Sequence, residues 1–310
     1  MELLLILDGL LPMMDFRENV QATLLYFDLF DHPLSASEIY TFFPQKMGEE
    51  EFEKQLSRQP FRSADGLFHV RRNDEVVFAR RKRERKARTM LYASRVVGSC
   101  LKYFPFVRGV YLSGSLSKGV NPGDADVDLF IITPEDRLWI CRSILTAFKK
   151  MFLFNKKKFL CPNYFVSEGH LEIPEKNIFT ATELITLRPL YNASMLQRLL
   201  DANRWISLFF PNFRRPRSKS KNGSSMVQRF LEIPMSDGNT SNWDDRLMHY
   251  FDKLWEKRYP GYTPEERDFL FRTTPYASKV HPRDFQTKVL DAYEERLGQE
   301  GLERLTRLDD

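Results

Sequence analysis

The stretch LSGSLSKGVNPGDADVDLFII, residues 112–132, decides the fold of this 310-residue chain. Ten residues separate its Gly-Ser turn, Gly114-Ser115, from an acidic strand start, Asp126-Val127-Asp128. Because side chains two apart in a strand share a face, Asp126 and Asp128 are predicted to point the same way, about 6–7 Å apart at their Cα atoms. Two carboxylates at that distance repel by about 2–3 kcal/mol. The pattern therefore indicates a bound cation, and oxygen ligands on a strand suit magnesium.

The Gly-Ser turn is suited to phosphate. Gly114 lets a ligand approach the backbone closely, and Ser115 offers an N–H and a hydroxyl to phosphate oxygens. If a helix begins near Leu116, its N-terminus adds a favourable field for an anion. A phosphate cradle and a carboxylate pair together predict a nucleotide–magnesium site. The competing interpretation is that GDADVD, residues 123–128, is a solvated acidic turn.

With an apolar strand on each side, this spacing resembles the signature of the polymerase-beta-like nucleotidyltransferase superfamily over residues 88–175. The resemblance implies an α/β (α+β) fold, a nucleotidyltransferase core with a small mixed sheet and helices on one face. It implies an enzyme that moves a nucleoside monophosphate from a nucleoside triphosphate to an unidentified hydroxyl acceptor. Asp126 and Asp128 would be the catalytic residues and hold two magnesium ions, and Gly114 and Ser115 would bind the nucleotide.

A narrower resemblance, over residues 15–210, is to prokaryotic nucleotidyltransferase-domain proteins with a small N-terminal helical module. The motifs that carry it are Pro105-Phe106-Val107-Arg108-Gly109-Val110, Cys161-Pro162-Asn163-Tyr164, Thr180-Ala181-Thr182-Glu183-Leu184 and Pro189-Leu190. This resemblance implies no particular substrate, so the acceptor and the nucleotide stay open.

The superfamily resemblance also implies a third carboxylate on a later strand, and here the chain departs from the pattern. Asn163 occupies the expected position, and an amide cannot act as a base. Glu168 and Glu172 lie just beyond it, and Asp124 is interpreted as a turn residue after Asn121-Pro122-Gly123. The alternative function is therefore a non-catalytic nucleotide-sensing or DNA-associated regulator with a degenerate core. A nucleotidyl-modifying toxin or its neutralising partner is neither supported nor excluded.

Residues 15–86 are predicted to form a winged-helix-like module. The spacing predicts three helices and then a hairpin, at 20–30, 35–43, 49–59, and 66–70 with 76–78. Ser35 and Glu38 have the spacing of a capping box at the second helix. The third helix starts with several glutamates, which DNA phosphates would repel. Nucleic acid is thus an alternative partner but not the favoured one.

A basic segment, residues 80–88, follows the hairpin and opens a helix that leads to the strand at Val110. Cations in a first helical turn oppose the helix dipole. The segment is interpreted either as a solvated basic face or as a contact for a triphosphate or polyanionic acceptor near the cleft.

The nucleotidyltransferase core is predicted at 87–175 and a helical C-terminal region at 176–310. Within that region we expect helical structure over 181–210 with a kink at Arg188-Pro189, a mobile loop near 212–242, and helices at 243–259 and 284–297. His249 and His281 are isolated in sequence, which favours core or surface roles over catalysis.

The composition and charge of the chain indicate the size of its core, the charge of its substrate and its compartment. Apolar residues make up 42% of the chain, with 26 Phe, so a substantial core can form. The net charge of +5 suits an anionic substrate without indicating nucleic acid. Three cysteines without metal-like spacing indicate a reducing compartment. The apolar N-terminus lacks a basic signal region, and no run reaches a membrane-spanning length, so we expect a cytoplasmic protein without a membrane partner.

Overall fold

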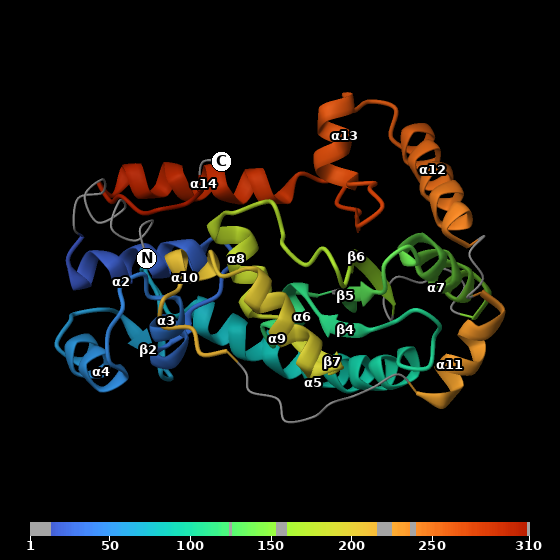
Figure 1. Ribbon diagram of the computed structural model, residues 1–310. Helices are drawn as coiled ribbons and strands as arrows, with labels where there is room; N and C mark the ends of the chain where they lie inside the picture. Colours follow the sequence, from blue (N-terminus) through green and yellow to red (C-terminus); the bar gives the residue numbers. More distant parts are fainter. Residues whose placement is uncertain (1–13, 124–125, 153–159, 216–224, 236–239, 309–310) are drawn as a thin grey trace.

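The computed structural model describes residues 14–123, 126–152, 160–215, 225–235 and 240–308 (Figure 1). Its helices are α2 Phe16–Asp28, α3 Ala36–Phe42, α4 Glu49–Ser57, α5 Glu75–Leu101, α6 Gly114–Ser117, α7 Leu138–Phe152, α8 Ile178–Ile185, α9 Ala193–Ala202, α10 Ile206–Phe209, α11 Met226–Glu232, η2 Ile233–Met235, α12 Thr240–Arg258, α13 Pro264–Phe271 and α14 Phe285–Gln299. Its strands are β1 Leu34–Ser35, β2 Ser63–Ala64, β3 Leu67–Phe68, β4 Gly109–Leu112, β5 Asp128–Thr133, β6 Cys161–Ser167, β7 Arg188–Tyr191 and β8 Ala277–Lys279.

The larger sheet has five strands in the order β7-β4-β5-β6-β8. Strands β5 and β6 run parallel, and the other neighbours run antiparallel. This confirms the predicted small mixed sheet and the α/β class. Leu112 at the end of β4 pairs with Leu129 near the start of β5. The turn that leaves β4 and the acidic residues that enter β5 therefore meet at one edge of the sheet.

Helices cover both faces of this sheet, so the expectation of helices on one face is wrong. Phe130 and Ile132 belong to an apolar cluster with residues of α2, α8, α9 and α14, whereas Leu129 and Ile131 pack with residues of α5, α7 and α12. Alternate side chains of a strand face opposite sides. Because every residue of β5 after Asp128 is buried, both sides need a cover. Figure 1 shows α5 along one side of the sheet and α14 beyond the other.

The N-terminal region contains the three predicted helices, and the Ser35–Glu38 capping box is present at α3. Its small sheet has the order β1-β3-β2. The predicted hairpin is wrong in its second strand, since β2 and β3 turn at Asp65-Gly66 and residues 76–78 belong to α5. Both turn residues have positive φ, which is what a two-residue hairpin turn needs. The winged-helix assignment and the domain boundaries stay predictions, and α5 runs across the 86–87 boundary.

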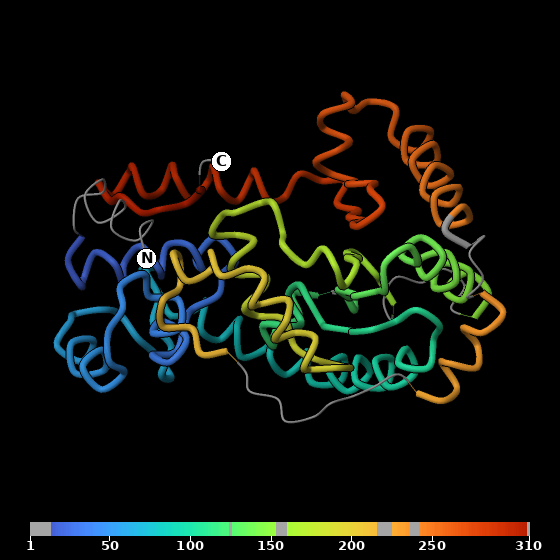
Figure 2. The backbone as a smooth tube through the Cα atoms, in the orientation of Figure 1, coloured from blue at the N-terminus to red at the C-terminus, as the bar shows by residue number. Residues whose placement is uncertain are grey.

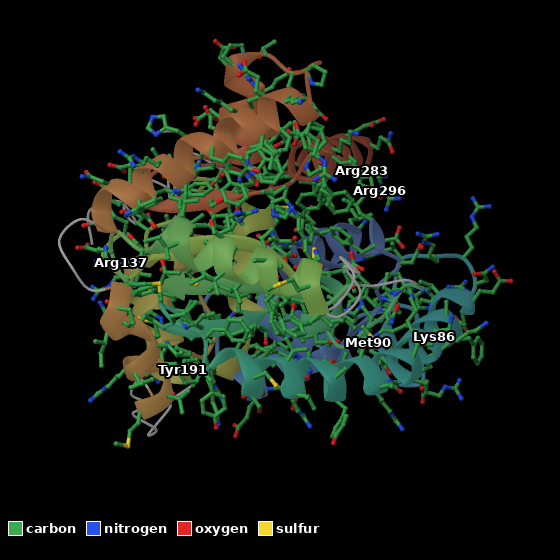
Figure 3. The ribbon with its side chains drawn as sticks, turned by 90° about the vertical axis from the view of Figure 1, so that its right-hand side faces the viewer. Lys86, Met90, Arg137, Tyr191, Arg283 and Arg296 are labelled. Carbon is green, nitrogen blue, oxygen red and sulfur yellow. The ribbon has the colours of Figure 1, made fainter. Side chains whose placement is uncertain are left out.

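Helix α5 begins at Glu75, so the basic segment lies beyond the first turn and not within it as expected. Part of the basic segment forms ion pairs inside the protein. Arg80 is buried and forms ion pairs with Glu38 and Glu84 at 2.8 and 2.9 Å. Lys86, in contrast, is exposed on α5, and Met90 one turn on is buried (Figure 3).

The C-terminal region differs from the expectation at Arg188-Pro189, which starts the strand β7 and does not kink a helix. Strand β7 is an edge strand, where the missing N–H of Pro189 is tolerated. Helices α12 and α14 confirm the two later helices. Within the predicted loop at 212–242, residues 225–235 form α11 and η2, and residues 216–224 and 236–239 lie outside the described residues. No helix in the described ranges is long and apolar enough to cross a membrane.

Candidate functional site

Gly114 and Asp128 are packed against each other where β4 ends and β5 begins. The Ser113 N–H donates to the Asp128 carbonyl oxygen at 2.9 Å. Gly114 has a φ of +68°, and a Cβ atom there would lie 2.7 Å from Asp128 Oδ2. Both the backbone conformation and the space next to the carboxylate therefore require glycine. The helix that follows, α6, spans only Gly114–Ser117.

A bulge in β6 brings Asn163 to the same carboxylate. Leu129 pairs with Pro162 and Phe130 pairs with Tyr164, which leaves Asn163 as the extra residue. Asn163 Nδ2 donates to Asp128 Oδ1 at 2.6 Å, and the Cys161 thiol donates to Asn163 Oδ1 at 3.1 Å. The amide orientation follows from this pattern of hydrogen bonds. Asn163 thus lies beside Asp128, on the side where the sequence predicted it.

The electrostatics of Asp128 are those of a carboxylate without a cation. Burial raises its pKa to about 7, against the hydrogen bond from Asn163, and the neighbouring acids Asp126 and Glu183 raise it further. Within the described part of the chain, no lysine, arginine or histidine forms an ion pair with Asp128. Its oxygens, with those of Asp126, are the donor type that magnesium prefers. The local charge and chemistry therefore fit a divalent cation.

Neither Glu168 nor Glu172, two acids that follow Asn163 in the sequence, joins Asp126 and Asp128. Glu168 Oε2 lies 3.6 Å from Arg198 Nη1, and Glu172 Oε1 lies 2.8 Å from Lys176 Nζ. Both are surface ion pairs. No cluster of three or more His, Cys, Asp or Glu that could hold a metal occurs in the described ranges. Asp124 lies outside the described residues.

Gly114, Ser115, Asp128 and Asn163 all line one cavity of about 600 Å³. Asp126 is half-buried just before β5 and is not among the residues that line the cavity. The other walls come from α2, from α8 and from residues 269–286. The tube drawing shows the chain between α13 and α14 passing beside the segment that leads into α8 (Figure 2). An ion pair of 2.9 Å between Lys279 and Glu175 joins these two segments.

Several cavity residues escaped the sequence analysis. Lys118, four residues after Gly114, forms a 2.6 Å ion pair with Glu183 of α8. His281 follows β8, and the adjacent Val280 N–H donates to the Asn163 carbonyl oxygen at 3.1 Å. The His281 side chain lines the cavity and is exposed to solvent. No spacing in the sequence links His281 to Asp128, because β8 joins the sheet from more than 100 residues away.

The comparisons with known proteins identify the class of this site. Residues 93–176 match the family model described as the nucleotidyltransferase domain. The match covers the Gly-Ser turn, Asp126, Asp128 and the strand that carries Asn163, so this part of the chain is a nucleotidyltransferase domain of the polymerase-beta-like superfamily. No curated protein and no solved structure matches the chain. The domain supports a general nucleotidyl transfer activity and a nucleotide substrate.

Proposed function

We propose that this protein transfers a nucleoside monophosphate from a nucleoside triphosphate to a hydroxyl group, with magnesium held by Asp126 and Asp128. Gly114 and Ser115 would hold the triphosphate. The observation that carries the proposal is the Asp128 carboxylate, which is partly buried against the Gly-Ser turn without a cation and has a pKa raised to about 7. Leaving a buried charge uncompensated is costly, so a ligand that supplies positive charge is expected there.

The roles of the residues follow from their contacts. Bound magnesium would neutralise charge on the triphosphate and on the leaving pyrophosphate. Gly114 keeps the turn close to Asp128, and Asn163 orients the Asp128 carboxylate through its hydrogen bond. The acceptor oxygen forms a bond to the α-phosphorus, and the bond to the pyrophosphate oxygen breaks. The acceptor proton passes to solvent, because Asn163 next to Asp128 cannot accept it and Glu183, a further acid near Asp128, is held by Lys118. We therefore expect slow turnover.

Label transfer tests this proposal. The protein is incubated with magnesium, a cell extract and each nucleoside triphosphate labelled at the α-phosphate, and then with the same nucleotides labelled at the γ-phosphate. The proposal predicts that only the α-label moves to an acceptor. Asp126→Asn and Asp128→Asn should lower transfer at least about 100-fold. Glu172→Gln, a surface substitution outside the cavity, should leave it unchanged. Transfer of the γ-label, or full activity in both Asn variants, would contradict the proposal.

A nucleotide-binding regulator without turnover is the second candidate, and one observation favours it. The Asn163 amide occupies a lone pair of Asp128, in the place where a third carboxylate would stand. Under this alternative, the wild type binds nucleotide with magnesium but transfers no label. Asn163→Asp adds a ligand charge and a base. Under either candidate function, this substitution should increase the melting-temperature shift caused by magnesium. Only if the wild type is a regulator without turnover would the substitution produce label transfer that the wild type lacks.

A further inference from the structure

Resting on the proposed function, we propose that the cavity beside Asp128 binds the acceptor, and that the acceptor is a small, uncharged, largely apolar hydroxyl compound. Four observations support this substrate class: the size of the cavity, the origin of its walls, the character of its lining, and the pairing of its charges.

The cavity is built by parts of the chain that lie outside the matched domain. The domain covers residues 93–176, whereas the opposite walls come from α2, α8 and residues 269–286. Lys118 joins α8 to the turn after Gly114, and Lys279 joins β8 to Glu175. These contacts close a volume of about 600 Å³ over the acidic site. That size is in the range for a small molecule.

The lining of this cavity is mostly apolar. The lining includes aromatic and aliphatic side chains from widely separated parts of the chain: Phe30, Phe130, Phe179, Leu187, Phe269 and Phe285. Phe179 of α8 and Phe285 of α14 meet edge to face, with ring centroids 6.0 Å apart. A lining of this kind gains free energy by removing apolar ligand surface from water.

Two pairs of opposite charges inside the cavity are already matched by the protein. Lys118 pairs with Glu183 at 2.6 Å, and Glu175 pairs with Lys279 at 2.9 Å. Asp128, which the proposed function assigns to magnesium, also lines the cavity and has no ion pair among the described residues. A polyanionic acceptor would need several cations that are not engaged, and a polycationic acceptor would need several free acids. Arg283 is exposed beside α14 (Figure 3), and Asp284 accepts the N–H of Thr287 as the cap of that helix.

His32, on one wall of the cavity, adds no charge at neutral pH. Its side chain is buried, and burial is the main cause that lowers its pKa to about 3, with the neighbouring Arg80 lowering the value further. His281 lines the same cavity and is exposed to solvent. The wall at His32 therefore suits a neutral ligand, with Asp128 at another side of the cavity.

The nucleobase is the competing occupant, and the wall suits it less well. A base has several donors and acceptors on its edge, and those left unpaired on binding cost free energy. Two polar side chains of the α8 wall, Thr182 and Glu183, are already engaged. Thr182 Oγ1 donates to the Ile178 carbonyl oxygen at 2.8 Å, and Glu183 is held by Lys118. A hydrocarbon body with one hydroxyl directed to Asp128 leaves fewer groups unsatisfied.

Three phenols of similar size provide the test: neutral 4-propylphenol, cationic tyramine and anionic 3-(4-hydroxyphenyl)propionate. Binding is measured by ligand-observed NMR with magnesium and a saturating α,β-methylene nucleoside triphosphate, which cannot transfer its nucleotide. The inference predicts that 4-propylphenol binds at least tenfold more tightly than either charged phenol. Phe179→Asp places a charge in the lining at a partly exposed position. It should weaken 4-propylphenol at least tenfold and leave nucleotide binding unchanged.

Two controls make the outcome unambiguous. Phe179→Leu keeps the lining apolar and should retain 4-propylphenol binding within about threefold, and Phe230→Asp, at an exposed phenyl on α11 outside the cavity, should change nothing. Equal binding of the three phenols, or preference for a charged one, would overturn the inference. Displacement of 4-propylphenol by the nucleotide analogue would assign the cavity to the nucleobase and leave the proposed function standing. Nucleotide binding that ignores Asp126→Asn and Asp128→Asn would instead overturn the proposed function.

Discussion

Two partly buried carboxylates, Glu175 and Asp128, line the same cavity and have opposite surroundings. Glu175 lies between two cations, with Lys279 at 2.9 Å and Arg272 at 3.1 Å. Burial alone would raise the pKa of Glu175, but Lys279 and Arg272 outweigh it and lower the value. Asp128 has an amide donor and no cation, and burial raises its pKa to about 7.

The difference separates a structural acid from a candidate binding acid. The ion pairs of Glu175 tie the segment before α8 to α13 and β8, so the protein itself compensates that charge. Among the described residues, nothing of opposite charge compensates Asp128. This contrast between Glu175 and Asp128 supports the proposal that Asp128 binds an external cation.

We expect the largest loss of stability when Glu175, the carboxylate with two cationic partners, is replaced. Glu175→Gln leaves two largely buried cations, Arg272 and Lys279, without their carboxylate partner. It should lower the free energy of unfolding by about 3–5 kcal/mol. Chemical denaturation measures the change. Glu172→Gln is the matched control, because its partner Lys176 is a neighbour on the surface, and it should change stability by less than about 1 kcal/mol. A similar loss in both variants would remove the contrast between Glu175 and Asp128.

We expect the second-largest loss of stability when a side chain is added at Gly114. Gly114→Val places a β-branched residue at a φ of +68° and a Cβ atom 2.7 Å from Asp128 Oδ2. Strain and overpacking together should cost about 2–4 kcal/mol of unfolding free energy. Nucleotide binding should be lost as well, because the turn and Asp128 must move apart. Gly123→Val is the control at another positive φ, 154°, where nothing lies within 4 Å of the added Cβ. Normal nucleotide binding by Gly114→Val would exclude the turn as the phosphate cradle.

The sequence predicted what depends on local spacing. The distance along the chain from Gly114 to Asp128, and the strands on either side, were enough to predict the turn, and the resemblance that they carry implied the mixed sheet. The same resemblance placed Asn163 at the position of a third acid near Asp128, although the bulge that lets both Asn163 and Tyr164 line the cavity leaves no mark in the sequence.

The errors share a different cause, since they depend on tertiary contacts. Val76 and Val77 suggested a strand, but they are buried in a small cluster with Leu67 as part of α5. Pro189 suggested a kink, but an edge strand accepts it beside β4. The cavity walls bring His32 and His281 together from opposite ends of the chain, and no periodicity could have indicated that.

Neutralising Asp128 should give a smaller change in stability, with the opposite sign. Because its folded-state pKa of about 7 exceeds the ordinary aspartate value of 3.8, the folded protein binds the proton more tightly than the unfolded chain. The stability linked to that proton is present at low pH and is lost as pH rises from about 4 through about 7. Asp128→Asn should therefore be more stable than the wild type at pH 8, on the order of 2 kcal/mol after allowance for solvent at the cavity.

Measuring both proteins at pH 5 and pH 8 isolates this carboxyl. The His32 and His281 rings are present in both proteins, so their contributions cancel in the difference. Magnesium with nucleotide should reduce the advantage of Asp128→Asn at pH 8, because the ligand stabilises only the wild type. A difference between the two proteins that does not vary with pH would contradict the picture of Asp128 as an uncompensated acid.

The smallest effect should come from Ser115, and it separates the turn's internal bonds from its ligand contacts. Ser115 lines the cavity, whereas the hydroxyl of Ser117 donates to the Gly114 carbonyl oxygen at 2.8 Å and is buried. Ser115→Ala should weaken triphosphate binding by about 1–1.5 kcal/mol, or five- to tenfold, with unchanged melting temperature. Ser117→Ala should lower the melting temperature instead. Calorimetric titration and thermal unfolding of both variants distinguish the two roles, and a loss of stability without loss of binding in Ser115→Ala would mean that its hydroxyl supports the turn and does not contact phosphate.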